Sequence, residues 1–306
     1  MLKKTLILAG LSICIASCDS KIKKKDAWGI GLTPCAARPS YVANSPLNTP
    51  TAALSTSEKR IKGLVMVDIK TGKTWQHESW TRFGSMGPIC TDKLGNTFVG
   101  PVPVINILEN KPEKQNILYK VDGRTGVMKP FIELPYESLP GDENPYGILG
   151  LHYDCHANLV IVSSVLGSDR INERGTIFIV DPEKEVIIDQ LDNYDAMGLS
   201  ICGVNGEKRL YFGSSRTSDI YSIEVSKNHT FIGEPRIECS LDMLGPRGDD
   251  KARKIGFKQD GTMVVKGISF DYNLTAPTEK LETNFVFIYD RSIKKWVNQV
   301  IPIVFN

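Results

Sequence analysis

The stretch NILYKVDGRTGV, residues 116–127, decides the fold of this 306-residue chain. Ile117, Tyr119 and Val121 alternate with residues of the opposite face, which is the pattern of a β-strand, and Thr125-Gly126 then turns the chain. This unit of strand, acidic residue, polar turn and second strand recurs as GLVMVDIKTGK from Gly63, GTIFIVDPEKEV from Gly175, SDIYSIEVSKNHT from Ser218 and NFVFIYDRSIKKW from Asn284. The five copies place their acidic residues at Asp68, Asp122, Asp181, Glu224 and Asp290.

A second hairpin precedes four of these copies. It reads GPICTDKLGNTFVG from Gly87, LHYDCHANLVIVSS from Leu151, LSICGVNGEKRLYFGSS from Leu199 and KIGFKQDGTMVVKG from Lys254. Each copy is a strand, a tight turn containing Gly or Asn, and another strand. Two consecutive hairpins form a four-stranded antiparallel sheet, and tandem sheets of this kind are the blades of a β-propeller.

The repeats predict an all-β propeller with five blades, and six blades is the alternative. Residues 26–62 and the strand 296–305 remain outside the repeats and suffice for one more half blade. The Ser- and Pro-rich stretch 39–57 is expected to meander, which leaves 28–32 as the best candidate for an early strand.

The order of strands in a blade separates the connections into two faces. The short turns, such as DKLGN and DGRTG, share one face, and five long loops share the other: 101–115, 134–146, 166–174, 241–253 and 269–283. Because binding sites usually lie on loops carried by a rigid scaffold, we expect the site at the mouth of the channel on the long-loop face.

The segment 197–225, MGLSICGVNGEKRLYFGSSRTSDIYSIEV, resembles a blade of the gluconolactonase and regucalcin-like propellers, and DKLGNTFVG with NILYKVDGRTG resembles the same broad, NHL-like superfamily. The resemblance implies a propeller fold and a lactonase that holds one divalent cation. The family has asparagine where this chain has Met197 and aspartate where it has Ser214. Methionine and serine are poor ligands for a hard cation, so we predict no metal site and no cofactor.

Other polar residues enter the inner strands from the long loops. If the ring is right, Asn144, Asp195, Arg216, Lys251 and Arg253 converge on one mouth and form a mixed-charge site for a small anionic or sugar-like ligand. The alternative is that they cap strand ends and pair with one another. His152 falls on an inner strand and is interpreted as a hydrogen-bonded residue of the channel wall.

The N-terminus reads as a bacterial lipoprotein signal. Lys3 and Lys4 precede a short apolar run, and Ile15-Ala16-Ser17-Cys18 forms a lipobox. We therefore predict a signal peptide at 1–17, a lipidated tether at 18–26 that begins with acylated Cys18, and a single propeller domain at 27–306. An ordinary secretory signal with a chance cysteine is the alternative.

Charge and cysteine content limit the partners. Removal of Lys3 and Lys4 reduces Lys plus Arg from 37 to 35, which equals the 35 Asp plus Glu, so the mature body is formally neutral and no nucleic-acid partner is expected. Five cysteines remain after Cys18, and an odd number leaves at least one unpaired thiol.

These observations predict a cell-envelope lipoprotein anchored to a bacterial membrane, inner or outer. Its propeller is expected to bind a small ligand or a protein through the long-loop face without catalysing a reaction. The alternative is a metal-dependent lactonase or hydrolase with a rebuilt site around Asp195 and Asn144, and only this enzyme would require Ca²⁺ or Zn²⁺.

Overall fold

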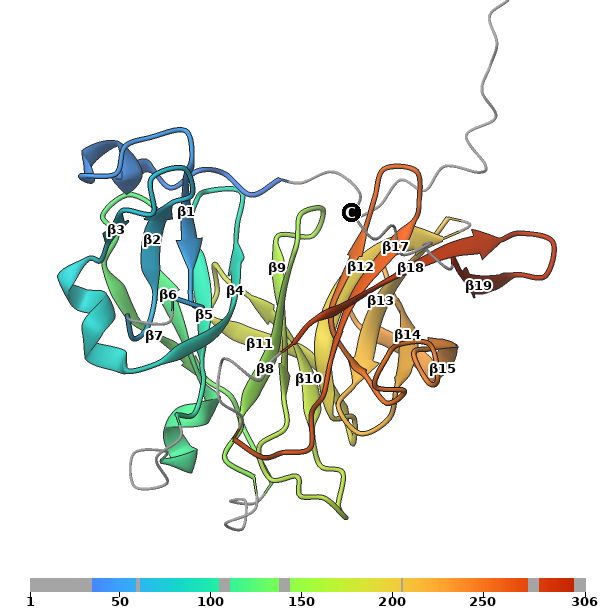
Figure 1. Ribbon diagram of the computed structural model, residues 1–306. Coiled ribbons are helices and arrows are strands. Elements are labelled where there is room, and N and C mark those ends of the chain that lie inside the picture. Colours follow the sequence, from blue (N-terminus) through green and yellow to red (C-terminus); the bar gives the residue numbers. More distant parts are fainter. Residues whose placement is uncertain are drawn as a thin grey trace, which may run out of the picture.

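The computed structural model describes residues 35–58, 61–104, 111–137, 144–204, 206–274 and 281–299 (Figure 1). The predicted signal peptide at 1–17, the lipidation site Cys18, the tether at 18–26 and the candidate strand at 28–32 lie outside the described residues. Within the described part of the chain, no helix is long and apolar enough to cross a membrane.

In the described part of the chain, nineteen strands form five antiparallel sheets, and each sheet is built from consecutive strands. The first has three strands, β1 (Ala52–Ser55), β2 (Val65–Asp68) and β3 (Thr74–Trp75). The second contains β4 (Met86–Thr91), β5 (Thr97–Pro101), β6 (Ile117–Val121) and β7 (Met128–Glu133), and the third contains β8 (Ile148–Asp154), β9 (Leu159–Ser164), β10 (Thr176–Asp181) and β11 (Val186–Asp192). The fourth contains β12 (Ala196–Val204), β13 (Glu207–Ser214), β14 (Asp219–Val225) and β15 (Phe231–Ser240), and the fifth β16 (Lys251–Phe257), β17 (Met263–Ile268), β18 (Thr283–Asp290) and β19 (Lys295–Asn298). The described connections contain three short 3-10 helices, η1 (Ser40–Asn44), η2 (Glu78–Phe83) and η3 (Pro112–Asn116).

The sheets are the blades of a five-bladed propeller, as the repeats predicted. Every hairpin named from the sequence is present, and the six-bladed alternative is wrong. One detail of the expectation is also wrong, because β1 lies inside the stretch 39–57 that was expected to meander. Its sequence, Ala-Ala-Leu-Ser, lacks the β-branched and aromatic residues that favour strands, so pairing with β2 determines its conformation.

The recurring acidic residue closes the short turns. Oδ1 of Asp68 accepts hydrogen bonds from the backbone amides of Lys70 and Thr71, at 2.9 and 3.2 Å. Asp122, Asp181 and Asp290 accept from the amides two residues on in the same way. Glu224 is the exception, because Oγ of Ser226 takes this role in its turn. Each hairpin thus carries its own turn-forming acceptor.

Four buried apolar clusters fill the spaces between consecutive blades. Near the axis the blades approach so closely that side chains are excluded. A Cβ on Gly150 of β8 would lie closer than 3.0 Å to the carbonyl oxygen of Met197 on β12, and one on Gly198 would meet the oxygen of Ala252 on β16 in the same way. These glycines therefore allow the tight inner ring.

An N-terminal strap, residues 35–45, crosses the short-turn face. Cys35 forms a disulfide with Cys155 in the β8–β9 turn, and the amide of Ala37 donates to the Asp92 carbonyl in the β4–β5 turn. The amide of Ser40 then donates to the carbonyl of Gly123 in the β6–β7 turn. The strap lies at the top of Figure 1, whereas the long loops lie at the bottom.

Candidate functional site

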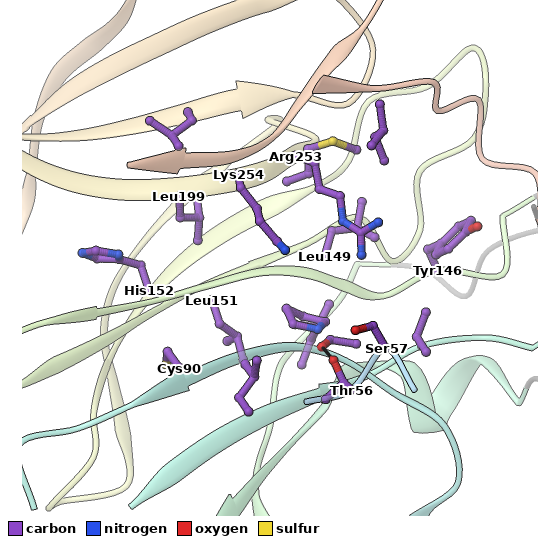
Figure 2. Close-up of a pocket in the computed structure, with 18 of the residues that line it drawn as sticks. Thr56, Ser57, Cys90, Tyr146, Leu149, Leu151, His152, Leu199, Arg253 and Lys254 are labelled. Carbon is purple, nitrogen blue, oxygen red and sulfur yellow. Dashed lines mark hydrogen bonds between the residues drawn. The ribbon is translucent and has the colours of Figure 1, made fainter. Parts of the chain in front are cut away.

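A cavity of about 540 Å³ lies on the propeller axis (Figure 2). Its wall is formed by the inner strands β4, β8, β12 and β16, and by Leu54 to Ser57 at the end of β1. The lining reaches Val102, Tyr146 and Phe270, which belong to the long loops. Oγ1 of Thr56 donates to the carbonyl of Gly87 at 2.6 Å and ties the first blade to the second at this wall.

A β-bulge in each of these four inner strands shapes the cavity. The pairing register shifts between Met86 and Ile89, between Ile148 and Gly150, between Ala196 and Leu199, and between Ala252 and Lys254. A bulge interrupts the alternation of side chains, so neighbouring residues can face the same side. For this reason two consecutive residues, Arg253 and Lys254, both line the cavity.

The lining combines apolar side chains with several hydroxyl groups, and its charged side chains are cations. Leucines, isoleucines, Val102, Met197 and aromatic rings form most of the described wall, and it contains no Asp or Glu. Lys254 has a carboxylate partner outside the wall, Glu282, at 3.8 Å. Burial lowers the pKa of Lys254 from its ordinary value, although Glu282 opposes the shift.

His152 lies in the cavity wall on β8, as the sequence predicted. Its Nε2 accepts a hydrogen bond from the amide of Ile201 on β12, at 3.2 Å, so the proton of the neutral ring is on Nδ1. Desolvation by burial lowers the pKa of His152 to about 4. Next to it in the structure, Asp154 forms an ion pair with Lys208. At neutral pH the imidazole is therefore an uncharged link between two blades.

Aromatic residues gather where the cavity meets the long loops. The rings of Tyr146 and Phe270 lie 5.2 Å apart, and the Tyr146 hydroxyl donates to the carbonyl of Asn273 at 2.9 Å. Phe270 in turn contacts Tyr272 at a ring distance of 5.2 Å. This cluster holds the β17–β18 loop against the β7–β8 loop.

The structure brings two of the five candidate residues into direct contact. Nε of Arg216 donates to Oδ2 of Asp195 at 2.7 Å, and the Asp195 carboxylate also accepts from Ser168, Tyr272 and the amide of Gly175. Both Asp195 and Tyr272 are buried. Asp195 and Arg216 are therefore the centre of a hydrogen-bond network between the loops.

Among the described residues, the other three candidates form no hydrogen bond or ion pair with Asp195 or Arg216. The side chain of Asn144 is buried, donates to the Val165 carbonyl at 2.8 Å and accepts from the amide of Tyr146 at 2.9 Å. Lys251 is half-buried at the start of β16, opposite Ile268, and Arg253 lines the cavity. Backbone groups and Arg216 thus occupy polar atoms of Asn144 and Asp195, while Tyr146, Val165 and Tyr272 pack in one buried cluster that connects their surroundings. A ligand-binding role for these residues stays a prediction.

The positions that the family resemblance assigned to a metal have other surroundings. Met197 is buried and lines the cavity, and Oγ of Ser214 accepts from the amides of Arg216 and Thr217, both at 3.0 Å. Among the described residues, no three His, Cys, Asp or Glu side chains are grouped so that they could hold a metal ion.

Sequence reasoning missed Lys254, Phe270 and the pair Thr56–Ser57 as cavity residues. Lys254 follows Arg253 directly, and strict alternation would have sent it to the opposite face. The run KARK beside a predicted inner strand was the available signal, but the bulge that turns both side chains inward leaves no mark in the sequence.

No protein-family model matches this chain, and no curated protein matches it. Solved structures do resemble it. A protein of unknown function from Bacteroides caccae has a TM-score of 0.44 and 10% identity, covering 80% of this chain and 70% of that one. A luciferin-regenerating enzyme has a TM-score of 0.49 and 7% identity, covering 90% and 76%. The β-propeller domain of the Trilobed protease from Pyrococcus furiosus has a TM-score of 0.40 and 12% identity, covering 81% and 71%. Likenesses at this level concern the fold and carry no argument about function.

Proposed function

We propose that this protein is a lipid-anchored envelope binding protein that holds a small molecule in its central cavity. The observation that carries the proposal is the cavity of about 540 Å³, which is bounded by four bulged inner strands and reaches the long loops. Ligand sites in proteins are commonly apolar cavities of about 300–1,000 Å³ with a few placed polar groups. The wall described above has this size and composition.

The loops around the cavity are braced, which favours binding. Asp195 and Arg216 join the β11–β12 and β13–β14 loops, and Tyr272 ties the β17–β18 loop to the same carboxylate. A site that is already ordered loses less conformational entropy when its ligand binds. The hydrogen bonds of Asp195 therefore hold the loops around the cavity in place.

The geometry favours a binding protein over the rebuilt lactonase. That enzyme would depend on Asn144 and Asp195, and both side chains are buried and satisfied by hydrogen bonds within the protein. A cation placed there would have to compete with Arg216 for Asp195.

Anchoring through acylated Cys18 completes the proposal. It rests on the lipobox, and the position of Cys35 on the short-turn face is compatible with it. In this arrangement the long loops, which lie on the opposite face, are directed away from the membrane. The membrane is the proposed partner of the lipid, and a small molecule is the proposed partner of the cavity.

The cavity is tested with Nile red, a neutral probe whose fluorescence rises in apolar sites. We expect saturable binding to the unsubstituted mature protein and at least tenfold weaker binding to Leu149→Trp, because the indole fills the lining. Ile171→Trp is the matched control, since Ile171 is 87% exposed on a long loop. Ser269→Trp, on the loop beside the cavity, repeats the test if Leu149→Trp unfolds at lower temperature. Equal binding by all variants overturns the cavity as the site.

The anchor is tested by membrane fractionation of the full chain. Cys18→Ser should move the protein to the soluble fraction, because stable attachment depends on the acyl chains. Cys239→Ser, which changes a cysteine in the body, should leave fractionation unchanged. Retention of the Cys18→Ser protein on membranes contradicts lipid anchoring.

A further inference from the structure

We infer that the ligand of the central cavity is an amphipathic monocarboxylic acid, with an apolar body and one carboxylate that pairs with Arg253. This inference rests on the proposed function, because it specifies the chemical class of the molecule in the same cavity. It is carried by the charge, the partners and the surroundings of Arg253.

Arg253 is a cation of the cavity wall whose guanidinium has no hydrogen-bonded partner among the described residues. It makes no hydrogen bond or ion pair with any residue that the structure describes, and it is half-buried. A guanidinium facing a space of low dielectric is costly unless an anion compensates it. Its planar fork matches the two oxygens of a carboxylate.

The partners of the two wall cations assign the carboxylate to Arg253. Lys254, the neighbouring cation, lies 3.8 Å from Glu282, which also accepts a hydrogen bond from Lys266 at 2.7 Å. Arg253 is thus the cation of the described wall that has no hydrogen bond or ion pair with a described residue, and its guanidinium offers one paired position, enough for a single carboxylate.

The other residues of the wall favour an apolar chain or ring as the remaining part of the ligand. Leu149, Leu151, Leu199 and Ile255 present alkyl surface, and the Tyr146 and Phe270 rings lie on the loop side. Several hydroxyls of the wall are already hydrogen-bonded within the protein: that of Thr56 donates to the carbonyl of Gly87, those of Ser55 and Ser57 bond to each other at 3.2 Å, and that of Tyr146 donates to the Asn273 carbonyl. A sugar would bring many hydroxyl groups to this surface and leave most of them without partners. An alkyl or aryl chain buries well against it.

The view into the cavity agrees with this orientation. Figure 2 shows Arg253 and Lys254 projecting from β16 toward the side on which Thr56 and Ser57 lie, with Tyr146 beyond the guanidinium. A carboxylate on Arg253 would be near the long loops, and its apolar chain would extend along Leu151 and Leu199.

The test compares an acid with its uncharged isostere. Binding of 4-phenylbutanoate and of 4-phenylbutanamide is measured by displacement of Nile red and by calorimetry at pH 7. We expect the acid to bind about 10- to 100-fold more tightly, since a charge-assisted pair contributes roughly 1.5–3 kcal/mol. Arg253→Met should remove this preference and leave amide binding within about twofold, whereas Arg253→Lys should restore part of it. Lys254→Met is the matched control and should weaken acid binding less than about threefold, because Glu282 already shares the charge of Lys254.

Each outcome decides a separate point. Equal affinities for acid and amide, with both lost in Leu149→Trp, overturn the inference and leave the proposed cavity function standing. Failure of both compounds and of Nile red to bind overturns the proposed function itself. A preference for the acid that survives Arg253→Met and disappears in Lys254→Met overturns the assignment to Arg253. Thermal unfolding of each variant shows whether a lost affinity reflects a lost fold.

Discussion

The buried carboxylate of Asp195 accepts a hydrogen bond from Nε of Arg216 at 2.7 Å, and this pair joins four loops on one face of the propeller. Ser168 and Gly175 bring in the β9–β10 loop, and Tyr272 brings in the β17–β18 loop. The guanidinium also donates to the carbonyls of Asp169 and Asn172. Two residues from neighbouring connections therefore hold the rim of the cavity together.

Removal of one partner of this pair should be strongly destabilising. Arg216→Met leaves the Asp195 charge buried without its cation, and Asp195→Asn leaves the guanidinium with the more distant Glu173, whose Oε2 lies 4.0 Å from Nε. Each should lower the free energy of unfolding by about 3–5 kcal/mol in urea denaturation. The control is Arg170→Met, which removes an exposed pair with Asp271 at 3.4 Å and should cost less than about 1 kcal/mol. Equal effects at the two sites would contradict a central role for the network.

The disulfide between Cys35 and Cys155 should stabilise the fold substantially. It joins residues 120 positions apart, and closing a loop of this length in the unfolded chain corresponds to about 4–5 kcal/mol. A thiol reductant should lower the urea midpoint of the mature protein, and alkylation with mass spectrometry should then reveal two new free thiols. The Cys35→Ser, Cys155→Ser double variant should match the reduced protein and show no further response to reductant. A reductant without effect on the midpoint would contradict the prediction.

His152 should make stability depend on pH below neutrality. Its folded-state pKa of about 4 lies below the ordinary value near 6.5, so the folded protein binds the proton less readily than the unfolded chain. The contribution is present above about pH 6.5 and declines as pH falls toward 4, by up to about 3 kcal/mol. An NMR titration should give a His152 midpoint near 4. His152→Gln should flatten this part of the stability curve, and His156→Gln, at an exposed position of the adjacent turn, should not.

The blades could be predicted from the sequence because their determinants are local. Alternating strands and a turn-forming aspartate recur within each hairpin, so Asp122 or Asp290 identifies its turn without knowledge of the rest of the chain. The inner-strand position of His152 followed from the same repeat, whereas Arg253 was expected at the end of the long loop 241–253 and lies in β16.

The features that sequence reasoning missed depend on contacts between distant segments. Nothing near Cys35 specifies Cys155 as its partner, and β1 is a strand because β2 pairs with it. The sequence does not specify whether the Asp195 side chain faces the channel. Hydrogen bonds from Arg216 and from the amide of Gly175 orient its carboxylate. The inward position of Lys254 needs a bulge that only the pairing of β16 with β17 reveals.

Glycines on the inner strands lead to a prediction about the ring itself. Gly150→Ala and Gly198→Ala would each push a methyl group into a backbone oxygen of the next blade, and backbone cannot rotate away as a side chain can. Each substitution should therefore lower the free energy of unfolding, measured by urea denaturation, by about 2–3 kcal/mol, as overpacking does. It should also change the affinity of the cavity for Nile red, because the inner strands must separate. Gly256→Ala lies in β16 with no atom within 4 Å of the added carbon, so it should leave stability within about 1 kcal/mol and probe binding unchanged. If all three variants behaved alike, close packing of the inner strands would not be what sets the width of the ring.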